Sequence, residues 1–170
     1  QGSDTVLAQI AAEILSLPVE RIRVTHSDTS VTPYDQSTSS SRSTFSMGNA
    51  VRLASIEIRE QLVAIAAKLL EISPDDLECR DGRVIPRGSP ERAVSYADVI
   101  RQHFGMAVGS IMGRGTWTTT GHLDPQTGQG KAAAFWFTSA AGCEVEVDTE
   151  TGQVEVLALA SAVNAGKALN

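Results

Sequence analysis

A long segment with helical periodicity in the first half of the chain is the feature that most limits the folds it can adopt. Apolar residues recur there every three or four positions, and charged side chains fill positions between them. The pattern predicts a helix from near Ser46 to about Glu71. The predicted buried stripe consists of Val51, Ala54, Ile58, Leu62, Ile65 and Leu69, and the predicted exposed set consists of Arg52, Glu57, Arg59, Glu60 and Lys68.

The beginning of the chain predicts another helix and a strand. The apolar spacing favours a helix that is capped by Asp4 or Thr5 and runs through Leu15. Residues 22–28, with the sequence IRVTHSD, place Ile22 and alternate residues on one side and are expected to form a strand. The polar residues that follow, as far as the long helix, predict an irregular segment.

Turn and capping residues organise the middle of the chain. Asp81-Gly82 lies between two alternating segments and predicts the tight turn of a hairpin. Ser95 and Asp98 have the spacing of a capping box, with Asp98 as a shorter equivalent of the usual Glu. Gly105 has the position at which a helix commonly ends. A hairpin followed by a short helix is therefore expected here.

The last third of the chain has the composition of β-strands. Residues 113–121 form a β-type run, and residues 132–148 and 152–163 predict two strands joined by a turn. Helices and strands are mixed without a strict βαβ rhythm, so we expect an α+β fold, a two-layer domain with helices packed on one face of a mixed β-sheet. A division into two subdomains, about 1–75 and 76–170, is also open.

Composition and charge narrow the classes of function. With 170 residues, 42% of them hydrophobic, the chain can bury a hydrophobic core without the help of disulfides or a structural metal. The net charge of −6, without a Lys/Arg cluster, argues against nucleic acid, and no apolar run is long enough for a membrane span. Cys79 and Cys143 lack metal-ligand spacing and predict free, buried thiols in a reducing, cytoplasmic compartment. Since the sequence starts without Met and within one turn of a helix, we expect it to be an excised part of a larger polypeptide.

Common catalytic motifs are missing from the sequence. Residues 127–135, TGQGKAAAF, invite comparison with a phosphate-binding loop, but Pro125 stands where that motif needs Gly and Ala132 where it needs Ser or Thr. A turn that leads into a strand is favoured instead. The three histidines have no metal-binding spacing, and no serine lies in a Gly-x-Ser-x-Gly elbow. We therefore assign no catalytic residue and no metal ligand.

The serine-rich stretch that precedes the long helix is a candidate site for an anion. The first amides of a helix lack internal partners and lie at the positive end of its dipole, which favours phosphate or pyrophosphate. A flexible loop or an ordinary helix cap remains an open alternative. The side chains that can donate hydrogen bonds here are Ser39, Ser40, Ser41, Arg42, Ser43 and Thr44.

Short motifs near both ends of the sequence resemble those of one known family. The first set is Gln1-Gly2, Thr5, Asp28-Thr29, the run from Ser39 to Thr44, and Gly48-Asn49-Ala50-Val51. The second set is Glu-Val-Glu-Val-Asp, Thr-Gly-x-Val and a final Asn-x-Gly-x-x-Leu-Asn, in which Asn164 stands where the family commonly has Asp. In this order and spacing they resemble the molybdopterin-binding region of the molybdenum hydroxylases, that is, the large subunits of the xanthine dehydrogenase, aldehyde oxidase and carbon monoxide dehydrogenase type.

The resemblance implies roles for individual residues. Gln1 would lie beside the molybdenum centre and could donate from its amide to an oxo or hydroxo ligand. The run from Ser39 to Thr44 would contact the pterin and its phosphate, and Arg42 would add positive charge for the phosphate or for the pyrophosphate of a cytosine dinucleotide form. Molybdenum is held by the pterin dithiolene, so no protein ligand to the metal is implied, and the family's catalytic Glu lies beyond this chain.

The resemblance also implies partners. The parent would be a molybdopterin-dependent oxidoreductase of xanthine, aldehyde, heterocycle or carbon monoxide, and this chain would be inactive alone. Its partners would be the remainder of the same subunit and the subunits or domains that carry FAD and iron–sulfur clusters. We further expect the excised chain to self-associate through an uncovered apolar face. The alternative is a non-enzymatic α+β scaffold or phosphate-binding module.

Overall fold

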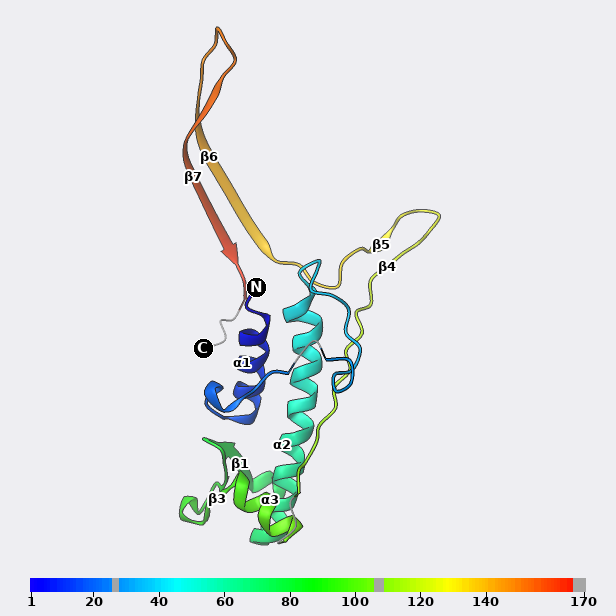
Figure 1. The fold of residues 1–170 in the computed structure, drawn as a ribbon, viewed down its shortest axis with the longest axis vertical. Coiled ribbons are helices and arrows are strands. Elements are labelled where there is room, and N and C mark those ends of the chain that lie inside the picture. Colours follow the sequence, from blue (N-terminus) through cyan, green and yellow to red (C-terminus); the bar gives the residue numbers. More distant parts are fainter. Residues whose placement is uncertain (26–27, 106–108, 167–170) are drawn as a thin grey trace. The chain divides into compact units, whose positions relative to one another are not determined.

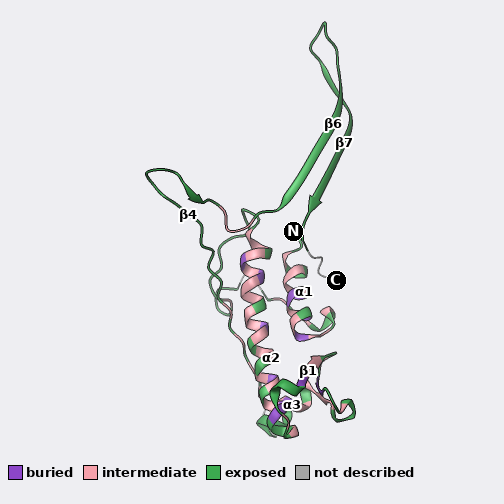
Figure 2. Cartoon of the chain, turned by 180° about the vertical axis from the view of Figure 1, so that it is seen from behind, coloured by how far each residue is buried: buried purple, intermediate pink, exposed green. Residues whose placement is uncertain are grey.

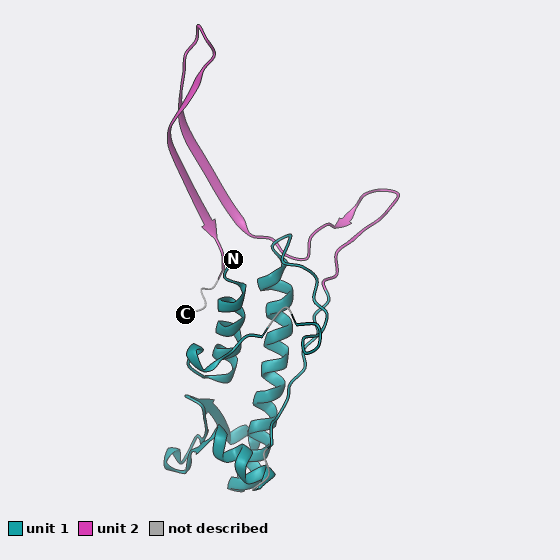
Figure 3. Cartoon of the chain, viewed as in Figure 1, with its two compact units in different colours: residues 1–118, 169 teal, residues 119–168, 170 magenta. Residues whose placement is uncertain are grey.

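The structure is a computed structural model that describes residues 1–25, 28–105 and 109–166 (Figure 1). Its contacts divide the chain into two units, one spanning Gln1–Thr118 and the other beginning at Thr119 (Figure 3). The sequence suggested a division near residue 75, whereas the contacts keep the elements that follow this residue with the long helix. The first unit contains α1 (Ser3–Leu15), α2 (Gly48–Leu70), β1 (Leu77–Arg80), β2 (Arg83–Pro86), β3 (Val94–Ser95) and α3 (Tyr96–Phe104). The second contains β4 (His122–Leu123), β5 (Gly130–Lys131), β6 (Thr138–Val147) and β7 (Val154–Asn164).

The long helix predicted from the periodic segment is confirmed. Helical hydrogen bonding begins with a π-helical turn at Ser43–Met47 and continues as α2. Leu62 is buried as expected. Leu69, also expected in the buried stripe, is 37% exposed, because Leu70 is the residue that packs against the core at this end of the helix. Among the described helices, none is both long and apolar enough to cross a membrane.

The core of the first unit lies between helices and a small sheet. The sheet has the order β1-β2-β3, and both neighbouring pairs are antiparallel. The turn between β1 and β2 has positive φ at Asp81 (50°) and Gly82 (71°), as the hairpin prediction requires. Helices α2 and α3 pack against this sheet, so the two-layer α+β arrangement is confirmed. The buried residues of this core are Leu62, Ala66, Ala67, Leu77, Val84 and Val99.

The strands do not form one mixed sheet. Besides the three-stranded sheet, the described residues contain two separate antiparallel pairs, β4-β5 and β6-β7. The sequence pattern shows which segments are extended, but it does not determine which edges pair. The expectation of a mixed sheet was therefore wrong in this detail, while the α+β class holds.

Close packing joins α1 to the beginning of α2. Ile10 of α1 is buried, and its Cδ1 atom lies 2.8 Å from the position that a Cβ atom would take at Gly48. Gly48 therefore allows the two helices to approach. The expected caps of α1 were wrong, because Asp4 and Thr5 lie inside the helix and Gly2, with φ of 79°, is the N-cap.

The other end of α1 is tied to the sheet by hydrogen bonds. The Tyr96 hydroxyl donates to the Leu15 carbonyl at 2.8 Å, and burial raises the pKa of Tyr96 further above its ordinary value. The Ser16 hydroxyl donates to the Cys79 carbonyl at 3.2 Å, and the Gly82 amide donates to the Ser16 carbonyl at 2.9 Å. These bonds connect the end of α1 to both β1 and α3.

Two segments that were expected to be strands are extended without a strand partner. Residues 22–25 form no ladder with any described residue, and the rest of that expected strand includes residues 26–27, which lie outside the described ranges. Residues 113–118 also join no sheet in the described part of the chain. They run instead along α2, where the Gln61 side chain donates to the Met112 carbonyl at 2.7 Å.

The two hairpins of the second unit end in turns of the same design. Asp124 and Asp148 each begin a segment of the form Asp-x-x-Thr-Gly-Gln. In the second turn, Asp148 Oδ1 accepts hydrogen bonds from the Glu150 and Thr151 amides at 2.8 and 3.0 Å, and Asp124 Oδ1 has the equivalent bonds. A glycine with positive φ then returns the chain to the second strand, with φ of 74° at Gly152.

The ribbon of β6 and β7 carries apolar side chains that the described chain leaves exposed (Figure 2). Its strands pair from Thr138 opposite Asn164 to Val147 opposite Val154. Val145 and Val147 alternate with acidic residues in the sequence, a pattern typical of a strand with one packed face, but these valines are 44% and 50% exposed. A two-stranded ribbon has no second layer of its own to cover such a face.

Truncating the core side chain of α2 tests the two-layer packing. Leu62→Ala is expected to lower the free energy of unfolding by about 2–5 kcal/mol, because it leaves a cavity between α2 and the sheet. Glu60→Ala, on the exposed side of the same helix, is expected to change it by less than about 0.5 kcal/mol. Urea denaturation followed by circular dichroism measures both. Equal effects of the two substitutions would contradict the packing described.

The Asp148 turn should respond to acid. Hydrogen bonds from the Thr151 and Glu150 amides hold the pKa of Asp148 below its ordinary value of 3.8. The turn is therefore stabilised above that value and loses this contribution as the pH falls through the lowered pKa. In an NMR titration, the Glu150 and Thr151 amide resonances should shift together with a midpoint below 3.8. Asp148→Asn should abolish this transition and preserve the one at the Asp124 turn, and a midpoint above 3.8 would refute the assignment.

Candidate functional site

The serine-rich stretch lies directly at the amino end of the long helix. Ser39 to Thr44 lead into the π-helical turn at Ser43–Met47, which is continuous with α2 (Figure 1). In a π-helical turn each amide bonds to the carbonyl five residues earlier, so this turn is wider than the α-helix that follows. The first amides of the turn, at Ser43 and Thr44, precede any possible partner within the helix.

Two consecutive serines in this loop adopt a left-handed backbone conformation. The φ angles are 52° at Ser40 and 55° at Ser41, whereas Arg42 is right-handed with φ of −83°. Neighbouring residues of opposite hand can point their amides to a common side and form a concave site for an anion. Left-handed geometry costs about 1–3 kcal/mol at a residue other than glycine, so other contacts must hold the loop. Sequence reasoning missed this feature because serine does not signal positive φ.

Arg42 supplies those contacts. Its guanidinium bonds to Asp35 Oδ1 at 3.0 Å and to the carbonyl oxygen of Gln36 at 2.5 Å. The Arg42 amide also donates to the Ser39 carbonyl at 3.1 Å. The side chain is only 20% exposed and closes residues 35–42 into a loop. The positive charge assigned from the sequence to a ligand's phosphate is therefore paired with Asp35 in this structure.

The hydroxyls of the loop remain available. In the described residues, none of the side chains of Ser39, Ser40, Ser41, Ser43 and Thr44 donates a hydrogen bond to another protein group, in contrast to Arg42. Most of these side chains are exposed, and that of Ser43 is half-buried. The arrangement offers neutral donors and helix amides, which suits an anion of phosphate size.

Gln1 lies at the same end of the helix pair as the serine loop. Both α1 and α2 have their amino ends there, where the N-terminus of the chain also lies (Figures 1 and 2). The contact between Ile10 and Gly48, together with contacts between α1 and the π-helical turn, supports this arrangement. The positive ends of two helix dipoles therefore face the same region. The Gln1 side chain is exposed.

The Asp28-Thr29 motif forms a self-contained turn. Asp28 Oδ1 accepts a hydrogen bond from the Ser30 amide at 3.0 Å and another from the Ser30 hydroxyl, and both lower the pKa of Asp28. The Thr32 hydroxyl donates to the Asp28 carbonyl at 2.6 Å. This motif therefore has a structural role in shaping the segment that leads to the serine loop.

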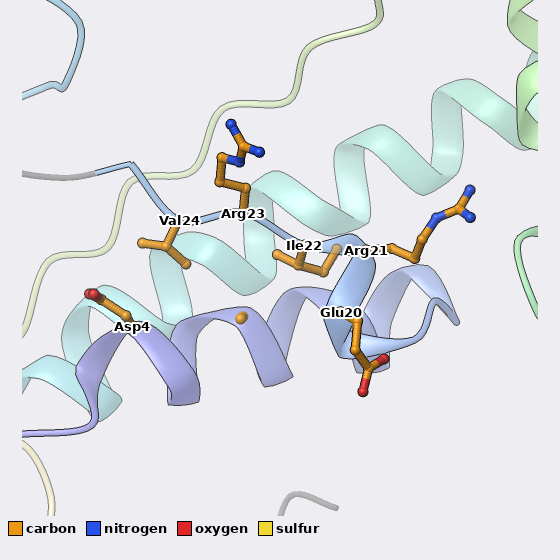
Figure 4. Close-up of a pocket in the computed structure, with 7 residues that line it drawn as sticks. Asp4, Glu20, Arg21, Ile22, Arg23 and Val24 are labelled. Carbon is orange, nitrogen blue, oxygen red and sulfur yellow. The ribbon is translucent and has the colours of Figure 1, made fainter.

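The other candidate sites in the described residues are weaker than the serine loop. A hollow of about 420 Å³ lies between α1 and residues 20–24, lined by Asp4, Ala8 and that segment (Figure 4), and its charged residues are exposed. Within the described ranges, no three His, Cys, Asp or Glu side chains are grouped to hold a metal ion. Cys79 and Cys143 are free thiols, but the expectation that both are buried was wrong, because Cys143 lies in the two-stranded ribbon of β6 and β7 and is exposed. Gly128 lies in the β4-β5 turn and Gly130 begins β5, which excludes a phosphate-loop helix there.

Comparison with known proteins identifies the family. The profile of the molybdopterin cofactor-binding domain matches residues 1–170. The 6-hydroxypseudooxynicotine dehydrogenase complex subunit gamma of Paenarthrobacter nicotinovorans is 32% identical over 91% of this chain and 22% of its own length. The probable hypoxanthine oxidase XdhD of Escherichia coli K12 is 29% identical over 99% of this chain and 16% of its own length. The chain thus spans less than a quarter of these relatives.

Solved structures agree with this result. CO dehydrogenase from Oligotropha carboxidovorans matches with a TM-score of 0.75 and 25% identity over 99% of this chain and 20% of its own. Quinoline 2-oxidoreductase from Pseudomonas putida 86 has the same TM-score with 22% identity, over 99% of this chain and 21% of its own, and supports the fold alone. The resemblance seen in the sequence motifs is therefore confirmed, and the chain belongs to the molybdopterin cofactor-binding domain family.

Proposed function

We propose that this chain cradles the phosphate end of molybdopterin in a longer oxidoreductase. The observation that carries the proposal is the loop from Ser39 to Thr44, whose hydroxyls have no described protein acceptor and which opens onto the first amides of α2. Membership in the cofactor-binding family supports the choice of ligand. When bound, the cofactor would supply the redox chemistry, and this chain would bind and orient it.

The residues of the loop fit a phosphate group. Hydrogen bonds from neutral donors to a charged acceptor are stronger than those between neutral groups, so several hydroxyls and amides can bind phosphate without a net positive charge. Ser43 and Thr44 each offer a hydroxyl beside a helix amide. We assign Ser39, Ser40 and Ser41 to the same ligand, with contacts to its pterin or phosphate.

Arg42 has a positioning role in this proposal. Its bonds to Asp35 and to the Gln36 carbonyl hold the left-handed serines in place. We therefore assign to Arg42 the shape of the loop in addition to the long-range attraction that its charge exerts on phosphate. Gln1 is assigned to the metal end of the cofactor because it matches the Gln that the resembling family has beside the molybdenum centre.

The activity and partners of the whole protein are part of the proposal. Because this chain spans less than a quarter of its relatives, the substrate site and the catalytic base would lie in the rest of the polypeptide. We propose a dehydrogenase or oxidase of the xanthine, aldehyde, heterocycle or carbon monoxide type, with molybdopterin or its cytosine dinucleotide. FAD and iron–sulfur clusters on other subunits or domains would carry the electrons away. Alone, the chain would be inactive and would self-associate through the exposed side chains of β6 and β7.

Loss of two hydroxyls at the helix start should weaken cofactor binding. The double variant Ser43→Ala and Thr44→Val removes both donors and keeps the backbone, and each lost bond to a charged group is worth about 1.5–3 kcal/mol. We expect at least roughly tenfold faster release of the pterin from the full-length protein, measured by its fluorescence after oxidation. Ser37→Ala, in the same loop, is the control and should behave as wild type.

The wild-type measurement tests the function itself. Molybdenum and pterin should co-purify with the full-length protein in near-equal amounts from cells supplied with molybdate. A protein that contains neither under these conditions would contradict the proposed function and favour a scaffold or a general phosphate-binding module.

Neutralising Asp35 separates the two roles of Arg42. If Arg42 only attracted phosphate, Asp35→Asn would strengthen binding, because it removes a negative charge beside the site. If Arg42 braces the loop, Asp35→Asn should weaken binding, since an ion pair of this exposure contributes about 0.2–1 kcal/mol. We expect roughly two- to fivefold faster pterin release in this variant, and slower release would refute the brace.

A further inference from the structure

An extended segment, residues 111–117, runs along α2 toward the serine loop and is called the strap below. The Arg114 amide donates to Glu57 Oε2 at 2.7 Å, and the Gln61 side chain donates to the Met112 carbonyl at 2.7 Å. Residues 111, 113 and 115 are half-buried, while residues 112, 114 and 116 are exposed. One side of the strap therefore packs against α2. The strap runs antiparallel to the helix, toward its amino end.

Two glycines allow this approach. A Cβ atom at Gly115 would lie 1.8 Å from the Ala50 carbonyl oxygen, and one at Gly113 would lie 2.1 Å from the Ala54 carbonyl oxygen. Both obstacles are backbone atoms of a helix, which cannot move aside without breaking its hydrogen bonds. Neither glycine has positive φ, so steric contact alone explains the need for glycine at these positions.

The strap places Trp117 beside the first turn of the helix. The indole ring of Trp117 packs edge-to-face on the ring of Phe45, with centroids 6.2 Å apart and planes at 83°. Phe45 lies within the π-helical turn and follows Thr44 directly. Trp117 is 39% exposed, so its ring is covered only in part, and its contact with Phe45 is the one ring contact of Trp117 among the described residues.

We propose that Trp117 is a positioning residue for the cofactor cradle, held in place by the glycine strap. The inference rests on the proposed function, because it concerns the same serine loop. A π-helical turn is less favourable than an α-helical one and persists where its surroundings support it. The ring pair fixes the half-buried Phe45, and thereby holds the adjacent Ser43 and Thr44 in the orientation that presents their donors to phosphate.

Variants of the full-length protein test this inference. Trp117→Ala should release the pterin at least fivefold faster than wild type, and Trp117→Phe, which keeps an aromatic edge, should restore most of the retention. Gly115→Ala should reproduce the Trp117→Ala effect, because the added Cβ atom forces the strap away from α2. Gly88→Ala is the matched control, since Gly88 has no atom near its Cβ position and no positive φ.

A core variant separates positioning from general stability. Val99 is fully buried in the core between α3 and the sheet, so Val99→Ala should lower the melting temperature while leaving pterin release at the wild-type rate. Trp117→Ala should release pterin faster than a core variant, such as Val99→Ala, that lowers the melting temperature by the same amount.

Two results would overturn the inference. One is wild-type pterin retention in Trp117→Ala, and the other is equally fast release from Val99→Ala at the same melting temperature. If either occurs while the Ser43 and Thr44 double variant still loses pterin, the proposed function stands and only the role of Trp117 fails. If the wild-type protein contains no pterin, both proposals fail together.

Discussion

The contact between α1 and α2 at Gly48 is the constraint on which the arrangement of the first unit depends. Because Gly48 has no side chain, Ile10 can reach the beginning of α2, and the two helices begin at the same end of the unit. That geometry brings the start of the chain and the serine loop to one region, although the loop between them is long. Two helix dipoles then favour negative charge there. The location of the candidate anion site thus follows from a packing contact between residues that are not themselves assigned to the ligand.

The candidate cradle uses neutral donors more than net charge. Arg42 is paired with Asp35, so residues 35–44 contribute no net charge, and in the proposed site the close contacts to phosphate would come from hydroxyls and helix amides. Such a site depends on orientation, because dipoles attract an anion only when they point toward it. In the proposed site, this dependence gives a role to the bonds of Arg42 within the loop and to the Phe45–Trp117 ring pair at the first turn of the helix.

Features that depend on local chemistry could be predicted from the sequence. Ser95 accepts from the Asp98 amide at 3.1 Å as the capping box requires, Asp81-Gly82 forms the tight turn, and the long helix was placed within three residues of its start. The position of the serine loop at a helix start was also predictable. Its left-handed serines and its π-helical turn were not, because serine and threonine are common in many loop conformations and their spacing does not specify one.

The sequence by itself determined where helices and turns form, which residues can donate hydrogen bonds to an anion, and which family the motifs resemble, since these properties depend on residues close together in the chain. Only the tertiary structure decided that Arg42 faces Asp35, that residues 111–117 lie against a helix instead of joining a sheet, and that Trp117 meets Phe45. An extended segment has the same residue pattern whether it pairs with a strand or packs on a helix. The choice follows from which surface has room for it, here the backbone of α2 opposite Gly113 and Gly115.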